Sequence, residues 1–418
     1  MTFPCQALAT LSAPSSTRSA GFCYRITIPL ESALAGNLKL DDIRARMGAE
    51  PPSSGTGWPG VEFPEPGASF TVGAQGAVRH AFGFGDLRRR GPIWDIAALG
   101  PERVGVVHDD CHLEIVRRDG TVALITGPEG YGVQVFAAPV PMVHVGSFRW
   151  KQNVPEDTVT RATLCRIEDE TLHPIVSCDR ACTFSVSQDG LVLVRGPPPD
   201  KGRKSVSRMA TDVILNPATG TATRCNLGHF DVFNNFLRID GAPHLFFVQG
   251  TPPDNPARQY LCSIAPNGTV RRHWPVLVDD GKEPNCASHA MECSFAWLRD
   301  KAGEALVAAG RHWTGRADCK GFFYRRDLPS GREAWRHVTG AVPAAIKCVP
   351  GRDIVLAAFL DGGLWAVRSD TGRILHQEMF ATDGQANVIF SFDVDPLYFY
   401  FGLLDGRYGR MPLASLGL

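Results

Sequence analysis

Apolar and polar residues alternate along most of the chain in short runs that end at glycine-containing turns. Leu113 to Val116 is followed by Arg117-Arg118-Asp119-Gly120, and Leu364 to Val367 leads to a turn at Asp370-Thr371-Gly372. Alternation with a period of two is typical of a β-strand with one buried face. Asp-Gly and Thr-Gly supply the positive φ that a tight hairpin needs. Each unit is therefore predicted to be a β-hairpin.

The same hairpin recurs along the chain. Its turn positions are 51, 49, 48, 63 and 41 residues apart, at Gly120, Thr171, Gly220, Gly268, Gly331 and Gly372. Between these turns the sequence provides two further strands per repeat, such as Ala344 to Val349 and Ile354 to Leu360. A repeat of about 40 to 50 residues with four antiparallel strands is the period of a β-propeller blade.

The predicted fold class is all-β, a seven-bladed β-propeller of four-stranded antiparallel blades, with six or eight blades as alternatives. The expected blades are Pro92 to Ile125, Tyr131 to Cys178, Ala181 to Leu227, Phe230 to Pro275, Met291 to Val338, Ala344 to Met379, and a last blade from Asn387. The last blade has only three strands, Asn387 to Val394, Leu397 to Gly402 and Arg407 to Leu413. An N-terminal strand, Ala77 to Gly83 or Cys23 to Leu30, is therefore expected to complete it and close the ring.

The chain is expected to contain two parts. Residues 1–76 form an N-terminal arm with one strand, a short helix around Lys39 to Met47 and a Pro/Gly-rich linker from Pro51 to Gly67. Residues 77–418 form the propeller. The arm is interpreted as a tether or partner-docking segment outside the ring.

The hairpins resemble the repeat of quinoprotein-type (PQQ-like) and WD40-like β-propellers, in which a strand leads through Asp-x-x-Thr-Gly to the next strand. Asn216 to Thr221 comes near this form, whereas Asp370-Thr371-Gly372 departs from its spacing. Trp274 and Trp335 fall near the position in the outer strand where the quinoprotein repeat carries its tryptophan. The chain lacks the adjacent Cys-Cys pair of quinoprotein dehydrogenases and the Gly-His and Trp-Asp signatures of WD40 repeats. The resemblance therefore implies an architecture and no activity.

Charge and composition narrow the classes of partner. The 418 residues carry 43 basic and 43 acidic side chains, so no field of one sign favours nucleic acid or an anionic membrane. The 43 glycines and 31 prolines exceed the roughly 12% expected together and indicate many turns and few helices. No run of 18 apolar residues exists, so no membrane span is predicted.

The twelve cysteines are scattered over a chain that is large enough to fold without disulfides, and they are predicted to be reduced. Cys165 and Cys262 lie within apolar runs and are expected to be buried. The protein is accordingly predicted to be cytoplasmic. The alternative is an organelle, because the first 30 residues contain Arg18 and Arg25 and no acidic residue.

Two segments carry potential metal ligands at close spacing. His108-Asp109-Asp110-Cys111-His112 falls where a turn belongs, and Cys286 to Cys293 contains neither CxxC nor HxxxH. Ordinary turn residues and idle thiols are the favoured interpretation of both. The sequence also lacks a P-loop, a nucleophile elbow, an HExxH and a dinucleotide-binding glycine motif after a strand. No catalytic residue, metal or cofactor is predicted.

The expected loops differ in length between the two faces of the disc. Turns from the first to the second strand of a blade and from the third to the fourth are short. The other face holds the insertions, which are Lys151 to Thr160, Pro197 to Ala210, Thr251 to Arg258, His312 to Cys319 and the blade-to-blade connection Leu277 to Ala290. Long loops on a rigid support are where binding sites concentrate. The leading hypothesis is a non-enzymatic scaffold that binds a protein or peptide on the long-loop face, possibly as a subunit of a complex. The predicted partner-face residues are Lys201, Arg203, Lys204, Arg208, His312, Trp313 and Arg316.

The alternative hypothesis is a small-ligand or metal-binding enzyme that uses the central channel, as propeller hydrolases and lactonases do. The inner-strand residues expected to form that site are Asp95, Asn234, Asn235 and Asn387. Convergent carboxylates and amides at the channel mouth would favour this alternative. Two turns, Asp189-Gly190 and Asp361-Gly362, are taken as markers of the face opposite the long loops.

Overall fold

The computed structural model describes residues 69–418, apart from 75–76, 84–92, 101–102, 109–112, 118–119, 126–131, 138–139, 147–161, 179–182, 197–207, 210, 226–228, 231–238, 243–244, 250–259, 276–288, 314–320, 329, 340, 342, 383–384 and 405. The described residues form an all-β fold with one short 3₁₀-helix, η2 (Leu413–Leu416). The predicted strand at Cys23 to Leu30 and the predicted helix near Lys39 lie outside the described residues.

Four sheets have four antiparallel strands each. The first contains β3 (Ile93–Ala98), β4 (Arg103–His108), β5 (Leu113–Arg117) and β6 (Val122–Ile125). The second contains β7 (Gly132–Phe136), β8 (Met142–Gly146), β9 (Ala162–Glu168) and β10 (Thr171–Cys178). The third contains β11 (Thr183–Val186), β12 (Val192–Gly196), β14 (Thr211–Asn216) and β15 (Thr221–Cys225). The fourth contains β25 (Pro343–Cys348), β26 (Ile354–Phe359), β27 (Gly363–Arg368) and β28 (Ile374–Met379).

Two neighbouring sheets depart from the four-stranded pattern, one with three strands and the next with five. One has β18 (Leu245–Gln249), β19 (Tyr260–Ile264) and β20 (Val270–Pro275). The next has β21 (His289–Asp300), β22 (Gly303–Trp313), β23 (Gly321–Asp327) and β24 (Glu333–Thr339). β17 (Ile239–Asp240) precedes β18 in the chain but pairs in parallel with β21, the one parallel pair among the described strands. β13 (Arg208–Met209) and β16 (His229–Phe230) form a small ribbon.

The last sheet combines the two ends of the described chain. Its strands β31 (Ile389–Val394), β32 (Tyr398–Leu403) and β33 (Tyr408–Pro412) are followed by β2 (Ala77–Gly83), which pairs with β33. β1 (Ser69–Ala74), β29 (Ala381–Thr382) and β30 (Gln385–Ala386) extend this sheet outward. β1 was not among the expected strands. β2 occupies the place beside β33 that the three-stranded pattern of the last repeat leaves open.

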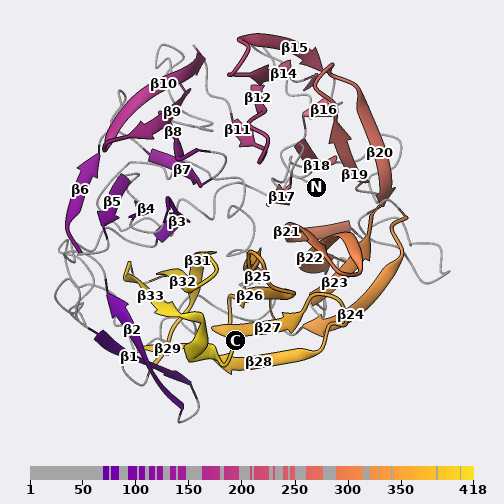
Figure 1. Cartoon of the computed structure of the whole chain (residues 1–418). Helices are drawn as coiled ribbons and strands as arrows, with labels where there is room; N and C mark the ends of the chain where they lie inside the picture. Colours follow the sequence, from indigo (N-terminus) through magenta and orange to yellow (C-terminus); the bar gives the residue numbers. More distant parts are fainter. Residues whose placement is uncertain are drawn as a thin grey trace.

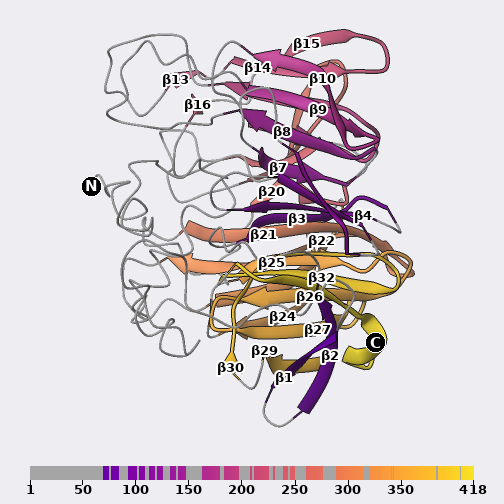
Figure 2. The same ribbon diagram turned by 90° about the vertical axis from the view of Figure 1, so that its left-hand side faces the viewer.

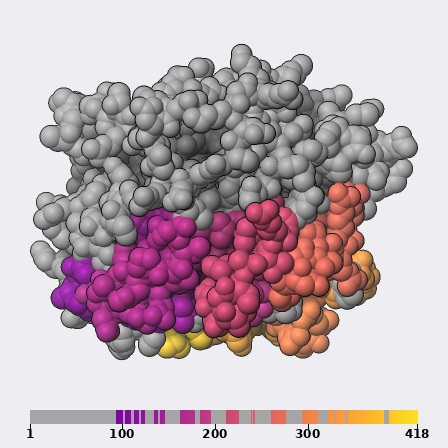
Figure 3. All heavy atoms as spheres, turned by 90° about the horizontal axis from the view of Figure 1, so that it is seen from above, coloured from indigo at the N-terminus to yellow at the C-terminus, as the bar shows by residue number. Residues whose placement is uncertain are grey.

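The sheets surround a central axis, as in a β-propeller. Figure 1 shows β3, β7, β11, β17, β21, β25 and β31 nearest the centre, with later strands of each sheet farther out. In Figure 2 the strands run along this axis, so each strand ends at one face of the disc or the other. Figure 3 shows the outer surfaces of successive sheets side by side along the rim.

The predicted hairpin turns adopt the backbone conformation that the sequence indicates. Gly120, Gly220, Gly268, Gly331 and Gly372 all have positive φ, between 67° and 83°. In the repeat whose predicted turn is at Thr171, no glycine is present at the turn. Asp169 and Glu170 form it, and they are the only described residues other than glycine with positive φ. The side chains of Asp and Glu tolerate this conformation less well than glycine, which explains why the repeat is hard to recognise there.

The core lies between neighbouring sheets. Leu356 and Leu364 of one sheet pack with Phe392 and Phe401 of the next, and all four are fully or almost fully buried. Outer strands also contact the turn of the following sheet. The Trp274 ring covers Gly331, and the Trp335 ring covers Gly372, where a Cβ atom would lie 2.6 and 2.7 Å from the indole. Glycine is therefore required at these turns both for its φ and for the tryptophan contact.

Candidate functional site

The described strand ends give the lengths of the connections on each face. Inner strands are joined to second strands by short segments, such as 301–302 between β21 and β22 and 395–397 between β31 and β32. Four of the seven connections between second and third strands are longer, such as 147–161 after β8 and 250–259 after β18, whereas 360–362 and 404–407 are as short as the turns of the other face. These are termed the short-turn face and the long-connection face. Asp361 and Gly362 join β26 to β27 and therefore belong to the long-connection face, so their use as markers of the opposite face was wrong.

Most of the predicted partner-face residues cannot be placed. Lys201, Arg203, Lys204 and Arg316 lie outside the described residues. The backbones of three others are described, but their side chains are not. Arg208 pairs with Phe230 in the small ribbon, whereas His312 and Trp313 end β22 opposite Ala290 and His289. Whether these residues contact a partner stays a prediction.

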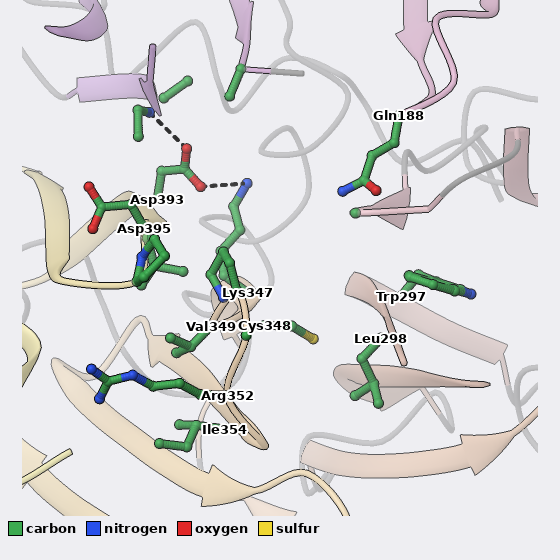
Figure 4. A pocket seen from close by; sticks show the side chains of 18 of the residues that line it. Gln188, Trp297, Leu298, Lys347, Cys348, Val349, Arg352, Ile354, Asp393 and Asp395 are labelled. Atoms are coloured by element: carbon green, nitrogen blue, oxygen red, sulfur yellow. Dashed lines mark hydrogen bonds and ion pairs between the residues drawn. The ribbon is translucent and has the colours of Figure 1, made fainter. Parts of the chain in front are cut away.

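A cavity of about 920 Å³ opens at the centre of the short-turn face. It is lined by the ends of the inner strands and by the turns that follow them, from β3, β7, β11, β17, β21, β25 and β31. Figure 4 shows Asp393, Asp395, Lys347 and Arg352 along one wall and Gln188 and Trp297 across the cavity. The short turns that follow the inner strands therefore form the described opening of the channel.

Two buried aspartates link neighbouring inner strands inside this cavity. Asp95 on β3 accepts a hydrogen bond from the Val135 backbone N–H on β7, at 2.9 Å. Asp393 on β31 accepts one from the Ala98 N–H, at 2.8 Å, and lies 3.5 Å from the Lys347 ammonium. Carboxylates that are held by backbone amides and a lysine join consecutive sheets. These contacts favour a structural role for both residues.

Asp395 holds the turn between β31 and β32. Its Oδ1 accepts hydrogen bonds from the backbone N–H groups of Leu397 and Tyr398, each at 2.7 Å, and its Oδ2 accepts one from the Tyr400 hydroxyl at 2.6 Å. Burial, together with the bond and the negative charge of Asp395, raises the pKa of Tyr400 well above its ordinary value. Tyr400 is therefore a neutral hydrogen-bond donor at physiological pH.

Beside the cavity, a buried ionic network joins the sheet of β21–β24 to that of β25–β28. The fully buried Arg325 guanidinium binds both oxygens of Asp300, at 2.5 and 3.2 Å, and donates to the Ser369 carbonyl at 2.9 Å. Ser369 Oγ donates to Asp300 at 2.6 Å. Burial by itself would raise the pKa of Asp300, but the hydrogen bonds from Arg325 and Ser369 outweigh it and hold the pKa below its usual value.

The cations of the lining differ in their surroundings. Lys347 is paired with Asp393, and Arg410 lies over the Tyr398 ring at 4.7 Å. Arg299 is exposed and is paired with Glu304. The Arg352 side chain is exposed and makes no ion pair or hydrogen bond with any residue that the structure describes. Arg352 is thus the one lining cation in the described chain with a charge available for a ligand.

Of the residues predicted for a channel enzyme, two have described positions, and of these only Asp95 lines the cavity. Asn387 is buried before the start of β31, and its Oδ1 accepts the Val388 N–H at 2.9 Å. Asn234 and Asn235 lie outside the described residues. Among the residues with described positions, no group of three or more His, Cys, Asp and Glu side chains could hold a metal ion.

His108 is the first residue of the segment His108 to His112, which carries potential metal ligands at close spacing. It ends β4 and is buried, with Nε2 3.1 Å from Glu114 Oε2, and the Tyr408 hydroxyl donates to the same carboxylate oxygen at 3.0 Å. Residues 109–112 lie outside the described chain. Four cysteines with a described state, Cys165, Cys225, Cys262 and Cys348, are thiols that form no disulfide, and the first and third are fully buried as predicted.

Comparisons with known proteins identify a similar architecture and no family. No known protein family matches the chain, and no curated protein does. The chain is similar to the WD40 β-propeller domain of Doa1, with 12% identity and a TM-score of 0.47 over 78% of this chain and 94% of that chain. It is also similar to the computationally designed Ika8 protein, with 13% identity and a TM-score of 0.42 over 79% and 99% of the two chains. These similarities are too distant to indicate a function. No helix in the described ranges has the length and apolar character of a membrane span.

Proposed function

We propose that the protein is a non-enzymatic scaffold, a β-propeller that binds a protein partner through its long-connection face. The observation that supports this most is the unequal length of the connections, because a rigid ring with long segments on one face presents variable chain from a fixed support. The carboxylates described in the channel are engaged by backbone amides and by basic side chains, which leaves them unsuited to acid–base catalysis.

A closed ring of seven blades is part of this proposal. In it, β2 is the fourth strand of the last blade, where it covers the edge of β33. Deleting residues 1–91 removes β1 and β2 and leaves that edge without a partner. The truncated chain is expected to melt at a markedly lower temperature in differential scanning calorimetry. A truncated chain that melts with the full chain contradicts this closure.

The partner itself is proposed to be acidic. The segment from Pro197 to Ala210 holds Lys201, Arg203, Lys204 and Arg208 against the single acid Asp200, a large charge for one segment of a neutral chain. Cations in an exposed segment steer acidic partners, and tryptophans such as Trp313 are common anchors at interfaces.

Affinity capture of the full chain from its native source, followed by mass spectrometry, identifies the partner. Reversing the four cations of this segment, or changing Trp313→Ala, is expected to reduce capture, the charge reversal more so at low salt. The matched control is Arg373→Glu, an exposed cation in a turn of the short-turn face. Equal losses in the control and in the segment variant would place the binding surface elsewhere.

The free thiols support a reducing compartment, and we propose that the protein is cytoplasmic. Cys165 is buried in an apolar environment, which raises the pKa of its thiol to about 11 and makes it unreactive in the folded state. Alkylation of denatured, unreduced protein is expected to label nearly all twelve cysteines. Several blocked cysteines would contradict the proposal.

A further inference from the structure

The cavity on the short-turn face has features that the scaffold function does not require. A closed ring needs its inner strands and tight turns, but it does not need an exposed cation without a partner or an exposed leucine at the mouth. Leu397 is 64% exposed in the turn between β31 and β32. Arg352 is exposed in the turn between β25 and β26. The two turns belong to consecutive sheets and line the same opening.

Positive charge in this cavity lies at the surface, and negative charge lies below it. The exposed lining residues include Arg299 and Arg352 and no carboxylate. The lining carboxylates are buried or half-buried, and each accepts a hydrogen bond or an ion pair within the protein. A ligand that approaches the mouth therefore meets the unpaired charge of Arg352 at the surface, although the lining as a whole contains five aspartates and four cations.

The lining of the same opening also offers exposed apolar surface. Leu397 and the exposed Pro396 and Pro350 lie on the rim, and the half-buried Trp297 lies across the cavity from Lys347 and Arg352 (Figure 4). A ligand that covers the exposed Leu397 side chain removes apolar surface from water, and this favours binding. A volume of about 920 Å³ lies near the upper end of the range for pockets that hold small ligands or a few residues of a peptide.

Two kinds of ligand fit these features poorly. A nucleic acid is a repeating polyanion, and its binding needs several unpaired cations, whereas Arg352 is the only one in the described lining. A simple inorganic anion would use Arg352 but would leave Leu397 uncovered. A ligand that joins one or two carboxylates to an apolar group uses both.

We propose that the mouth of the channel on the short-turn face binds an acidic peptide segment, with a carboxylate of the peptide on Arg352 and an apolar side chain against Leu397. This site is separate from the long-connection face, so the protein would engage two ligands on opposite sides of the ring. The same arrangement would allow one partner to cap the channel while another binds the long connections.

The test uses the full chain and fluorescein-labelled hexapeptides. One pool contains two acidic residues, two of Leu or Phe and two serines, and the comparison pool has lysine in place of the acids. Fluorescence anisotropy is expected to show binding of the acidic pool only. Arg352→Glu is expected to weaken binding at least tenfold, since it replaces an attraction by a repulsion. Leu397→Ser is expected to weaken it about threefold to tenfold by removing apolar contact.

Arg373→Glu is the matched control, because it makes the same charge change at an exposed position in the same sheet and on the same face, outside the cavity. It is expected to leave the affinity unchanged. Equal weakening by Arg352→Glu and Arg373→Glu, or equal binding of the two peptide pools, would overturn the proposal. Arg352→Glu is also expected to leave capture through the long connections intact, so each proposal can fail without the other.

Discussion

Two interfaces between neighbouring sheets are held together by different kinds of contact. Between β21–β24 and β25–β28, a tryptophan on the outer strand covers a turn glycine, and the buried Arg325–Asp300 pair adds charge. Between the last sheet and the first, the links are at the inner and middle strands. Ser391 donates to the Ile93 carbonyl, Asp393 accepts from Ala98, and Tyr408 donates to Glu114. We refer to these as the internal interface and the closing interface.

The distances along the chain explain why the two differ. Contacts of the internal interface join residues 34 to 69 positions apart, whereas those of the closing interface join residues 294 to 298 apart. Bringing the more distant residues together costs about 1.5 kcal/mol more in chain entropy. Along the chain, the last and first sheets are joined only through β2, which leads to β3 by residues 84–92 and is held in the last sheet by its pairing with β33. Three side-chain hydrogen bonds add to this link.

The largest expected effect comes from breaking the buried Arg325–Asp300 ion pair of the internal interface. Arg325→Met leaves the Asp300 carboxylate buried without its charged partner, and this is expected to lower the free energy of unfolding by about 3 to 5 kcal/mol. Urea denaturation measures the loss. The double variant Asp300→Leu, Arg325→Met removes both charges and is expected to recover much of it. A single variant as stable as the double one would mean that the pair is not energetically coupled.

A third interface, between the sheets of β7–β10 and β11–β15, is expected to respond to acid. His144 is buried, with its ring edge-on to Phe184 at 4.8 Å between centroids, and burial lowers its pKa to about 3. The unfolded chain takes up this proton near pH 6.5, so the stability that neutral His144 provides is complete above that pH and is lost as the pH falls toward 3. The loss is roughly 1.4 kcal/mol per pH unit.

Urea midpoints at pH 7, 6, 5 and 4.5 test this behaviour. The variant His144→Leu is expected to show a shallower decline of stability with falling pH than the natural sequence. His173→Leu changes an exposed histidine of the same sheet and serves as the control. Parallel pH profiles for the natural sequence and His144→Leu would show that another group governs the acid response.

The tryptophan contact of the internal interface can be isolated with two glycines of the same sheet. Gly372 and Gly351 both have a φ of +70°, but a Cβ at Gly372 would lie 2.7 Å from the Trp335 indole, whereas nothing lies within 4 Å at Gly351. Both Ala variants carry the strain of positive φ. Gly372→Ala is expected to cost about 1 to 3 kcal/mol more because it also overpacks the interface. Equal costs by calorimetry would show that the ring yields to the added methyl group.

The smallest expected effect is at the closing interface. Tyr408→Phe removes the hydrogen bond to Glu114 and leaves His108 beside that carboxylate, so the free energy of unfolding is expected to fall by about 1 kcal/mol. Tyr398→Phe, on the half-buried face of the neighbouring strand, provides the comparison. A loss at Tyr408 of the same size as that from Arg325→Met would remove the distinction between the two interfaces.

The sequence predicts the repeats well because their signal is local. Turn glycines such as Gly268 and Gly372 mark each hairpin, and the strands of the last repeat are within two residues of their predicted limits. The parallel pairing of β17 with β21 and the presence of β1 were missed. A two-residue strand such as β17 leaves no periodic pattern, and β1 lies outside the repeat from which the strands were predicted.

The site was harder to predict, because it depends on contacts between residues that are distant in the chain. Asp95 was selected as a channel residue and does line the cavity, but its hydrogen bond to Val135 depends on how two inner strands meet. Arg352 and Leu397 lie in turns that look like ordinary connections. The only feature of the sequence that could have indicated this cavity is the set of short turns, which surround one opening in the folded ring.

The chain separation at the closing interface also determines the order of events in folding. Contacts between residues nearly 300 positions apart carry a large loop-closure cost, so they are expected to form late in folding and to have φ-values near zero. Weakening them therefore speeds unfolding and leaves the refolding rate almost unchanged. Ser391, Asp393 and Tyr408 thus act on the lifetime of the folded ring, whereas the tryptophan–glycine contacts between consecutive repeats can form while the sheets are being assembled.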